Sequence, residues 1–333
     1  MPSQDRPRVT VFSLGGTIAM TAQPDGTVAP ALSASELLGA VPQLSEVEAE
    51  LDVRDFRRLP GASLSFDDLF SLASAIREAV EHGADGVVVT QGTDTIEETA
   101  YFLDLQCSGL APIVVTGAMR NPTMAGADGP ANILAAVRTA ADRRAPWRSL
   151  VVFADEIHAA NQVRKTHSTS VTAFTSWPGP IGFVAEDRVH IQGTASPAAR
   201  VTSAPTCKVR TALVTVALGD DGGVIEGIGA YVEGVVIAAF GAGHVPSDCV
   251  PALEKLAARI PVILATRTGR GPVLRKTYGF PGSESDLLSR GLISAGTLDP
   301  AKAKVLLHTA LMAGATSNEI RDLFSEEPHD AKP

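Results

Sequence analysis

The first half of the chain carries short, uninterrupted runs of apolar residues, many of them β-branched, each bounded by glycine, proline or polar residues. Runs of this length and composition are typical of parallel strands that are buried on both faces. They lie at residues 8–13, 86–90, 112–116 and 149–153. The pattern therefore predicts a buried parallel sheet in this half of the chain.

Between these runs the apolar spacing changes to that of an amphipathic helix. It is clearest at residues 65–82, where Ser65 and Asp68 are placed to cap the helix start. The apolar stripe consists of Leu69, Leu72, Ala73, Ile76 and Val80. Strands that alternate with helices indicate βαβ units. The sequence thus predicts an α/β fold whose larger N-terminal domain is a doubly wound, mostly parallel sheet.

A second group of strand-like runs follows a segment of different composition. Residues 193–210 are rich in small residues and proline and show little periodicity, which is typical of a linker. Further strand patterns lie at 211–218, 234–241 and 261–268, with a helical pattern at about 248–259. With 333 residues the chain also exceeds the usual size of one domain. We predict an N-terminal domain at 1–192, this linker, and a smaller C-terminal α/β domain at 211–333.

Composition and charge exclude several classes of function. The net charge is -9, and no run of lysine or arginine stands out against it, so nucleic acid is not an expected partner. No apolar run approaches the roughly 18 residues of a membrane span, so no membrane partner is expected either. The N-terminus shows no signal-peptide pattern, which predicts a cytoplasmic location. Three widely spaced cysteines indicate neither a disulfide framework nor a zinc site.

Two segments place a threonine beside glycine directly after a strand-like run. They read SLGGTIA at residues 13–19 and VVVTQGTDTIEETAYF at residues 87–102. In the second, Thr93 and Asp94 put a hydroxyl and a carboxylate at the carboxyl end of a strand, where open α/β sheets bind ligands. Asp94 can alternatively be the N-cap of a helix at 95–106.

Thr17, Thr93 with Asp94, Ala118 and Lys165 all fall in loops that follow predicted strands, so we expect them at one crevice. A threonine hydroxyl is a weak acid and needs a nearby base. A lysine serves as that base only where its surroundings lower its pKa from about 10.4. Lys165 is therefore either the base or an ordinary surface cation, and Thr17 is either a nucleophile or a threonine of a tight glycine turn.

These segments resemble those of the bacterial L-asparaginases, the asparaginase/glutaminase family of threonine amidohydrolases. Further matches, in the family's order, are GAMRNPTMAGADGPANI at 117–133, RKTHS at 164–168, YGF at 278–280 and SAGTLDPAKAKVLLHTAL at 294–311. The resemblance implies hydrolysis of the side-chain amide of L-asparagine to L-aspartate and ammonia, through an acyl-threonine and without a cofactor. It also implies that the N-terminal domain is catalytic and that dimers assemble into tetramers.

The resemblance assigns catalytic roles to four side chains. Thr17 carries the hydroxyl that attacks the amide carbon, and Thr93 is activated by Lys165 and Asp94. Which threonine acts first is left open by the sequence. Asp94 also binds the α-amino group of the substrate, which favours a free amino acid over a simple amide.

Further contacts with substrate follow from the same resemblance. The backbone N–H groups of Gly92 and Thr93 face the developing oxyanion, and the Ala118 carbonyl accepts a hydrogen bond from the leaving amide nitrogen. Glu284, supplied by a neighbouring subunit, completes the amine site. We therefore count these residues among the substrate-binding positions.

Two segments depart from the family pattern. Residues 20–30 contain no tyrosine, although the best-known members carry one in the mobile loop after the first threonine. Residues 60–65 place Gly61 and Ala62 where many members have a serine and a glutamine that hold the substrate, which leaves Ser63 as the hydroxyl that could substitute. We expect residues 20–30 to act as a lid over the site.

Other functions fit parts of the pattern. A glutaminase-asparaginase acting also on L-glutamine, or an amidase for another aspartyl amide, remains open because the substrate-holding segment departs from type. A non-catalytic amino-acid-binding protein would need Asp94 but neither threonine nor lysine. A dinucleotide-dependent oxidoreductase needs GxGxxG after the first strand, where SLGGTIA stands. His158 and His167 lack the spacing of a metal-binding pair, so no metal is expected.

Overall fold

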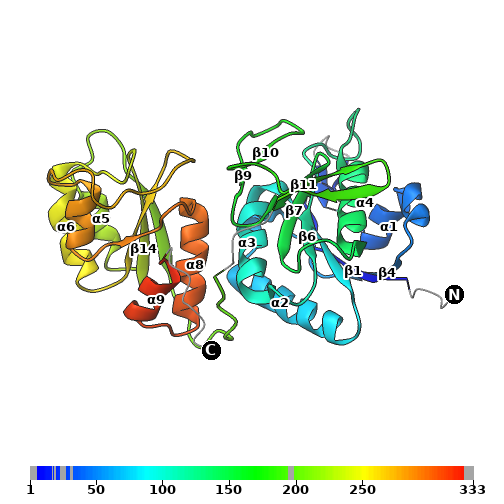
Figure 1. Ribbon diagram of the computed structural model, residues 1–333, viewed down its shortest axis with the longest axis horizontal. Coiled ribbons are helices and arrows are strands. Elements are labelled where there is room, and N and C mark those ends of the chain that lie inside the picture. The colour runs from blue at the N-terminus through cyan, green and yellow to red at the C-terminus, as the bar shows by residue number, and fades with distance from the viewer. Residues whose placement is uncertain are drawn as a thin grey trace. The chain divides into compact units, whose positions relative to one another are not determined.

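The computed structural model describes residues 6–16, 18, 20–22, 28–30, 33–193 and 199–325. The chain folds into two compact units that divide between Thr202 and Ser203 (Figure 1). Two elements of the sequence prediction, Thr17 and the centre of the expected lid at 23–27, lie outside the described residues. The flanks of that lid are β2 (Met20–Ala22) and β3 (Val28–Pro30), which pair antiparallel.

An eight-stranded sheet forms the centre of the first unit, in the order β12-β11-β8-β7-β6-β5-β1-β4. Its strands are β1 (Arg8–Ser13), β4 (Glu50–Asp55), β5 (Gly86–Thr90), β6 (Ile113–Thr116), β7 (Ser149–Phe153), β8 (Glu156–Ala159), β11 (Gly182–Ala185) and β12 (Arg188–Ile191). The strands from β4 to β7 in this order are parallel, and β8, β11 and β12 continue the sheet antiparallel. This confirms the mostly parallel sheet predicted from the sequence.

Helices cover both faces of this sheet (Figure 1). They are α1 (Ala34–Gly39), α2 (Phe66–Glu81), α3 (Ile96–Cys107) and α4 (Gly129–Ala141), with 3-10 turns at η2 (Pro42–Glu46), η3 (Gly61–Ser63) and η4 (Thr93–Thr95). α1 and α4 share a core with Val9, Val88 and Val114. α2 and α3 pack together through the rings of Phe70 and Phe102 and lie on the opposite face. The doubly wound arrangement is thus confirmed.

The predicted helix at 65–82 is α2, and its capping is confirmed as well. The Ser65 side chain accepts a hydrogen bond from the Asp68 N–H, and the Asp68 carboxylate accepts one from the Ser65 N–H at 3.1 Å. This hydrogen bonding lowers the pKa of Asp68, with the Ser65 hydroxyl and then the Arg57 guanidinium as its main partners. The local sequence therefore fixes where this helix begins.

The second unit is built on a smaller parallel sheet in the order β13-β14-β15-β16. Its elements are β13 (Thr211–Thr215), α5 (Gly223–Ile228), β14 (Gly234–Ala239), η5 (Ser247–Cys249), α6 (Val250–Ala257), β15 (Val262–Thr266), α7 (Glu284–Ser289), β16 (Ile293–Ser294), α8 (Pro300–Met312) and α9 (Ser317–Leu323). Helix α8 contacts β13, β14 and β15, and α5 and α6 pack through a separate core with Ile225, Leu253 and Leu256. The predicted C-terminal α/β unit is confirmed.

Candidate active site

Three glycines bring the loops after β1, β4 and β5 into direct backbone contact. Gly16 has a φ of +84°, and a Cβ on it would lie 2.0 Å from the Gly92 nitrogen. A Cβ on Gly61 would lie 2.7 Å from the Gly92 carbonyl oxygen. Any side chain at these positions would collide with backbone, so the close approach requires glycine. The loops therefore meet at the carboxyl ends of three parallel strands.

Thr93 lies at this meeting point. It begins η4, two residues after the Gln91 that follows β5, and it is buried. Lys165 is the last residue of β9 (Val163–Lys165), which pairs with β10 (Phe174–Ser176) in a separate two-stranded hairpin. The Lys165 Nζ donates hydrogen bonds to Thr93 Oγ1 at 2.9 Å and to Asp94 Oδ1 at 3.3 Å. The structure thus brings together three residues that are up to 72 positions apart.

Two details of the sequence interpretation are wrong. Lys165 does not lie in a loop after the fifth parallel strand, β7, because β8 follows that strand and Lys165 is itself the last residue of β9. Asp94 is not the N-cap of α3, since Thr95 occupies that position. The Asp94 side chain is 62% exposed and faces the Lys165 ammonium. It is therefore available to a ligand as well as to the lysine.

A buried hydrogen-bond network that the sequence did not reveal supports the Thr93 loop. Gln91 is fully buried, and its Nε2 donates to the Gly92 carbonyl and to Thr95 Oγ1, each at 3.2 Å. The Thr95 hydroxyl in turn donates to the Gly61 carbonyl at 2.9 Å. This network joins η4 to η3, which carries Ser63, an exposed residue. The sequence signal for Gln91 was a polar residue between a strand-like run and Gly92, which resembles any polar loop residue.

Ala118 follows β6 on the same edge of the sheet, and it is buried. The preceding Gly117 packs against the Thr93 loop, because a Cβ there would lie 2.5 Å from the Gln91 carbonyl oxygen and 3.4 Å from the Thr93 Cγ2. The loops after β5 and β6 are therefore neighbours. Of the predicted site residues in the first unit, Gly61, Ser63, Gly92, Thr93, Asp94, Ala118 and Lys165 are described.

Glu284 belongs to the second unit, where it is fully buried at the start of α7. Its Oε1 accepts hydrogen bonds from the N–H groups of Thr277 and Tyr278, both at 2.9 Å, and its Oε2 lies 3.3 Å from His244 Nε2. Burial raises the pKa of Glu284, but hydrogen bonds from the N–H groups of Tyr278, Thr277 and Glu284 itself, together with the nearby His244, hold that pKa below its usual value. Within its own unit, Glu284 organises the 277–284 loop.

His158 anchors the hairpin that carries Lys165. It is a fully buried residue of β8, and its Nδ1 lies 2.9 Å from Ser176 Oγ on β10. Its Nε2 lies 3.5 Å from Glu156 Oε2. Burial lowers the pKa of His158 from 6.5 to about 4, so the ring is neutral at pH 7.

We expect His158 to make the protein less stable in weak acid. The unfolded chain takes up the proton near pH 6.5 and the folded chain near pH 4, so the unfolded state binds more protons between these values. The free energy of unfolding should therefore fall as the pH is lowered through this window, by up to about 3 kcal/mol. Urea unfolding at pH 7, 5.5 and 4.5 should show a weaker pH dependence in His158→Gln. His190→Gln, which removes an exposed imidazole, is the control and should show the pH dependence of the parent. The same pH dependence in His158→Gln as in the parent would contradict the account.

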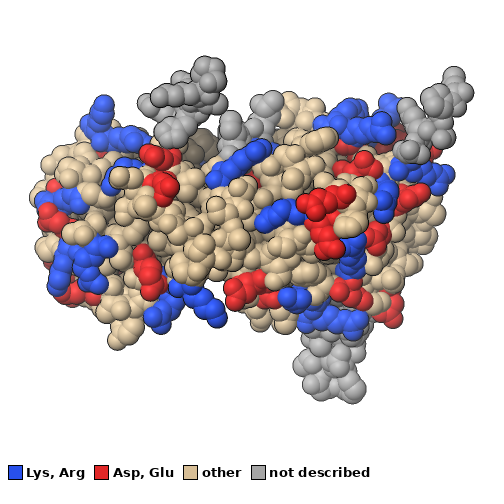
Figure 2. All heavy atoms as spheres, turned by 90° about the horizontal axis from the view of Figure 1, so that it is seen from below, with Lys and Arg blue, Asp and Glu red and all other residues tan. Residues whose placement is uncertain are grey.

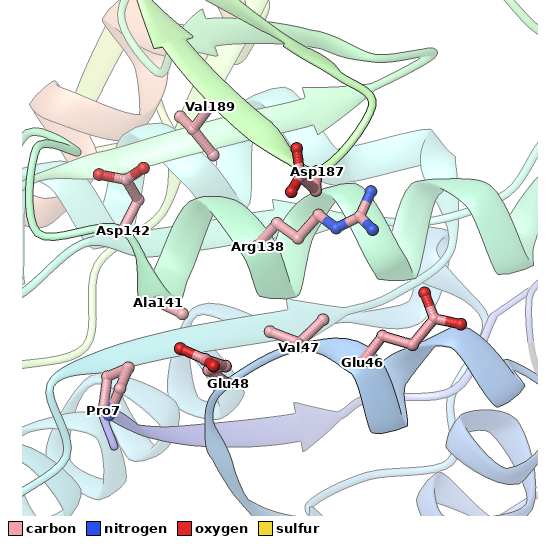
Figure 3. Close-up of a pocket in the computed structure, with 9 residues that line it drawn as sticks. All are labelled: Pro7, Glu46, Val47, Glu48, Arg138, Ala141, Asp142, Asp187 and Val189. Atoms are coloured by element: carbon pink, nitrogen blue, oxygen red, sulfur yellow. The ribbon is translucent and has the colours of Figure 1, made fainter. Parts of the chain in front are cut away.

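A cavity of about 580 Å³ lies elsewhere on the first unit. Figure 3 shows Arg138 extending from α4 into the space between Asp187 and Glu46. Pro7, just before β1, and Asp142, just after α4, also line it. The cavity is therefore at the amino ends of the parallel strands, opposite to the end where such sheets bind ligands.

The described residues contain no group of three or more histidine, cysteine, aspartate or glutamate side chains that could hold a metal ion. The polar groups gathered around Thr93 are instead a hydroxyl, an ammonium and a carboxylate. A hydroxyl beside a lysine is the arrangement of an activated nucleophile with its base.

Comparisons with known proteins show the family to which this chain belongs. Residues 8–197 match the family model "Asparaginase, N-terminal", and residues 210–324 match "Glutaminase/Asparaginase C-terminal domain". The chain belongs to the asparaginase family. The chain is 37% identical over 327 residues to a probable L-asparaginase of Deinococcus radiodurans, covering 96% of this chain and 98% of that protein.

Two further proteins named as probable L-asparaginases are similar to this chain, one in sequence and one in solved structure. It is 32% identical over 333 residues to a probable periplasmic L-asparaginase of Haemophilus influenzae, with 97% of this chain and 93% of that protein covered. The crystal structure of a probable cytoplasmic L-asparaginase from Campylobacter jejuni matches with a TM-score of 0.84 at 30% identity, covering 96% of this chain and 99% of that chain. The similarity therefore extends over more than nine tenths of this chain and of each of these relatives.

Proposed function

We propose that this protein is an L-asparaginase, which hydrolyses the side-chain amide of L-asparagine to L-aspartate and ammonia through an acyl-threonine. The observation that carries the proposal is the contact of Lys165 Nζ with both Thr93 Oγ1 and Asp94 Oδ1. It occurs in a chain of the asparaginase family, and the relatives from Deinococcus radiodurans and Haemophilus influenzae are named as probable L-asparaginases. Hydrolysis needs no cofactor in this scheme.

The proposed chemistry uses the lysine as a proton carrier. In its neutral form Lys165 accepts the proton of the Thr93 hydroxyl, 2.9 Å away. Thr93 then acts as a nucleophile or, if Thr17 attacks first, relays the proton that Thr17 releases. The acyl carbon–nitrogen bond breaks, ammonia leaves, and water hydrolyses the threonine ester in the second half of the reaction. The N–H groups of Gly92 and Thr93 stabilise the oxyanion.

Substrate recognition follows from charge. The exposed part of the Asp94 carboxylate binds the α-ammonium of L-asparagine, and Ser63 contributes a hydroxyl from η3. Glu284 is proposed to act from a neighbouring subunit of a dimer or tetramer. Glu284 itself is fully buried, but the side chain of the adjacent His244 is 22% exposed. Solvent therefore reaches the His244–Glu284 pair through His244.

The remaining assignments concern partners and location. Positive and negative side chains are interspersed over the visible face of each unit in Figure 2, so that face offers no uniform basic patch for nucleic acid. No helix in the described part of the chain is both long and apolar enough to cross a membrane. We propose a cytoplasmic enzyme with a catalytic domain at 1–192, a linker at 193–210 and a C-terminal domain at 211–333.

Ammonia release from a panel of free amides tests the proposed function. The panel contains L-asparagine, L-glutamine, D-asparagine and propionamide, and L-aspartate is quantified beside ammonia. We expect L-asparagine to give equal amounts of ammonia and L-aspartate and the highest kcat/KM. Equal or higher kcat/KM for L-glutamine would show a glutaminase-asparaginase instead. Binding of L-asparagine without any ammonia would indicate a non-catalytic amino-acid-binding protein.

A further inference from the structure

Part of the loop between β6 and α4, residues 117–128, lies over a gap in the packing. A small apolar cavity of about 50 Å³ lies under it, lined among others by Ala118, Ile18 and Ile133. Side chains around an empty space lose contacts on one side, so packing restrains such a loop weakly. Hydrogen bonds therefore add to the packing of Gly117 in fixing the position of Ala118.

Asp128 supplies two of these hydrogen bonds. It is the N-cap residue of α4, yet its side chain accepts no capping hydrogen bond from the backbone N–H groups of that helix. Its Oδ2 accepts from the Met119 N–H at 3.0 Å, and its Oδ1 accepts from the Arg120 N–H at 2.9 Å. An aspartate at an N-cap ordinarily binds the N–H groups of its own helix. Here the carboxylate holds the two residues that follow Ala118.

Asn132, one helical turn further on, holds the residue that precedes Ala118. It is 2% exposed, and its Nδ2 donates to the Gly117 carbonyl at 3.0 Å and to Asp128 Oδ2 at 3.2 Å. Its Oδ1 accepts from the Ala154 N–H at 3.0 Å, in the turn after β7. Asp128 and Asn132 thus hold the residues on both sides of Ala118 by hydrogen bonds. Asn132 also links this pair to the turn after β7.

We propose that Asp128 and Asn132 are positioning residues that hold the Ala118 carbonyl against the leaving group, and so make the site selective for amides over esters. The proposal rests on the proposed function. In acylation the threonine oxygen–carbon bond forms, the carbon–nitrogen bond breaks, and the hydroxyl proton passes through Lys165 to the nitrogen, which leaves as ammonia. The amide N–H donates to the Ala118 carbonyl during this step. An ester oxygen carries no proton and gains nothing from that carbonyl.

The test compares L-asparagine with the β-methyl ester of L-aspartate in Asp128→Ala and Asn132→Leu. We expect kcat/KM for L-asparagine to fall about 10- to 100-fold, the size of a lost hydrogen bond to a reacting group. For the ester it should stay within about threefold, since no hydrogen bond to the leaving group is lost. If Asp128 and Asn132 had a merely structural role, kcat/KM would fall equally for both substrates. That result would overturn the inference.

Two further variants keep the result decisive. Asn121→Ala alters the same loop, but the Asn121 side chain binds the N–H and hydroxyl of Thr123 and not the residues beside Ala118. The ratio of kcat/KM for the amide to kcat/KM for the ester should therefore remain that of the parent. Asp128→Asn retains one acceptor oxygen and should recover part of the ratio, and it replaces Asp128→Ala if that variant does not fold. An unchanged ratio in both Asp128 variants would contradict the inference. Parent protein that releases no ammonia from L-asparagine would instead refute the proposed function.

Discussion

Replacing Lys165 by methionine should abolish most turnover of L-asparagine while leaving the fold intact. Methionine retains the length of the side chain but removes the amine that lies 2.9 Å from Thr93 Oγ1. Proton transfer by a positioned side chain contributes typically about 10²- to 10⁴-fold, so we expect kcat to fall by about 10³-fold. Thr93→Ala should give a loss of similar size. Ammonia release under saturating L-asparagine measures both.

The double variant and a neighbouring cation provide the controls. Groups that act as a unit are strongly non-additive, so Thr93→Ala with Lys165→Met should be little worse than either change by itself. Arg164→Met also removes a positive charge from β9, but successive side chains of a strand point to opposite faces, so its kcat should stay close to the parent value. Activity near that of the parent in Lys165→Met would remove the lysine from the mechanism.

Blocking the α-amino group of the substrate should have the second-largest effect. N-acetyl-L-asparagine cannot offer an ammonium to the Asp94 carboxylate, so a charge-assisted hydrogen bond is lost. We expect its kcat/KM to be about 30- to 100-fold below that of L-asparagine, in line with hydrogen bonds to charged groups. Ammonia release from the two compounds gives the ratio directly.

The Asp94→Asn variant tests whether this discrimination belongs to Asp94. The variant should lose turnover because Asp94 also contacts Lys165, but the ratio between free and blocked asparagine is the informative quantity. That ratio should collapse towards one, since a neutral amide no longer favours the ammonium. Parent protein that hydrolyses both compounds equally well would show that recognition does not depend on the amine.

Four parallel strands of the large sheet could be predicted from the sequence because they are continuous apolar runs, whereas β4, with the sequence ELDVRD, is not such a run. β1, β5, β6 and β7 lie where those runs lie, each buried on both faces. The strands that continue the sheet antiparallel are 4 residues long and partly exposed, so they carry no such run. Their pairing depends on turns such as Ala154 and Asp155, both with positive φ, which the sequence does not mark by glycine.

The site was predictable where it rests on motifs and unpredictable where it rests on tertiary contacts. Thr93, Asp94 and Lys165 stand in segments whose chemistry is visible from residue type, and the structure places them in contact. Asp128 and Asn132 look like an N-cap and a helix residue in the sequence. Only the path of the preceding loop shows that both side chains turn back to hold it.

The central claim is that a threonine of this crevice carries the acyl group, and trapping that group tests it most directly. The enzyme would be mixed with saturating L-asparagine, quenched in acid during the initial burst of ammonia, digested and mapped by mass spectrometry. The account predicts an aspartyl ester on Thr93 or Thr17, and none in Lys165→Met treated identically. A burst of ammonia with both threonines unmodified, or with the aspartyl group on another residue, would contradict it.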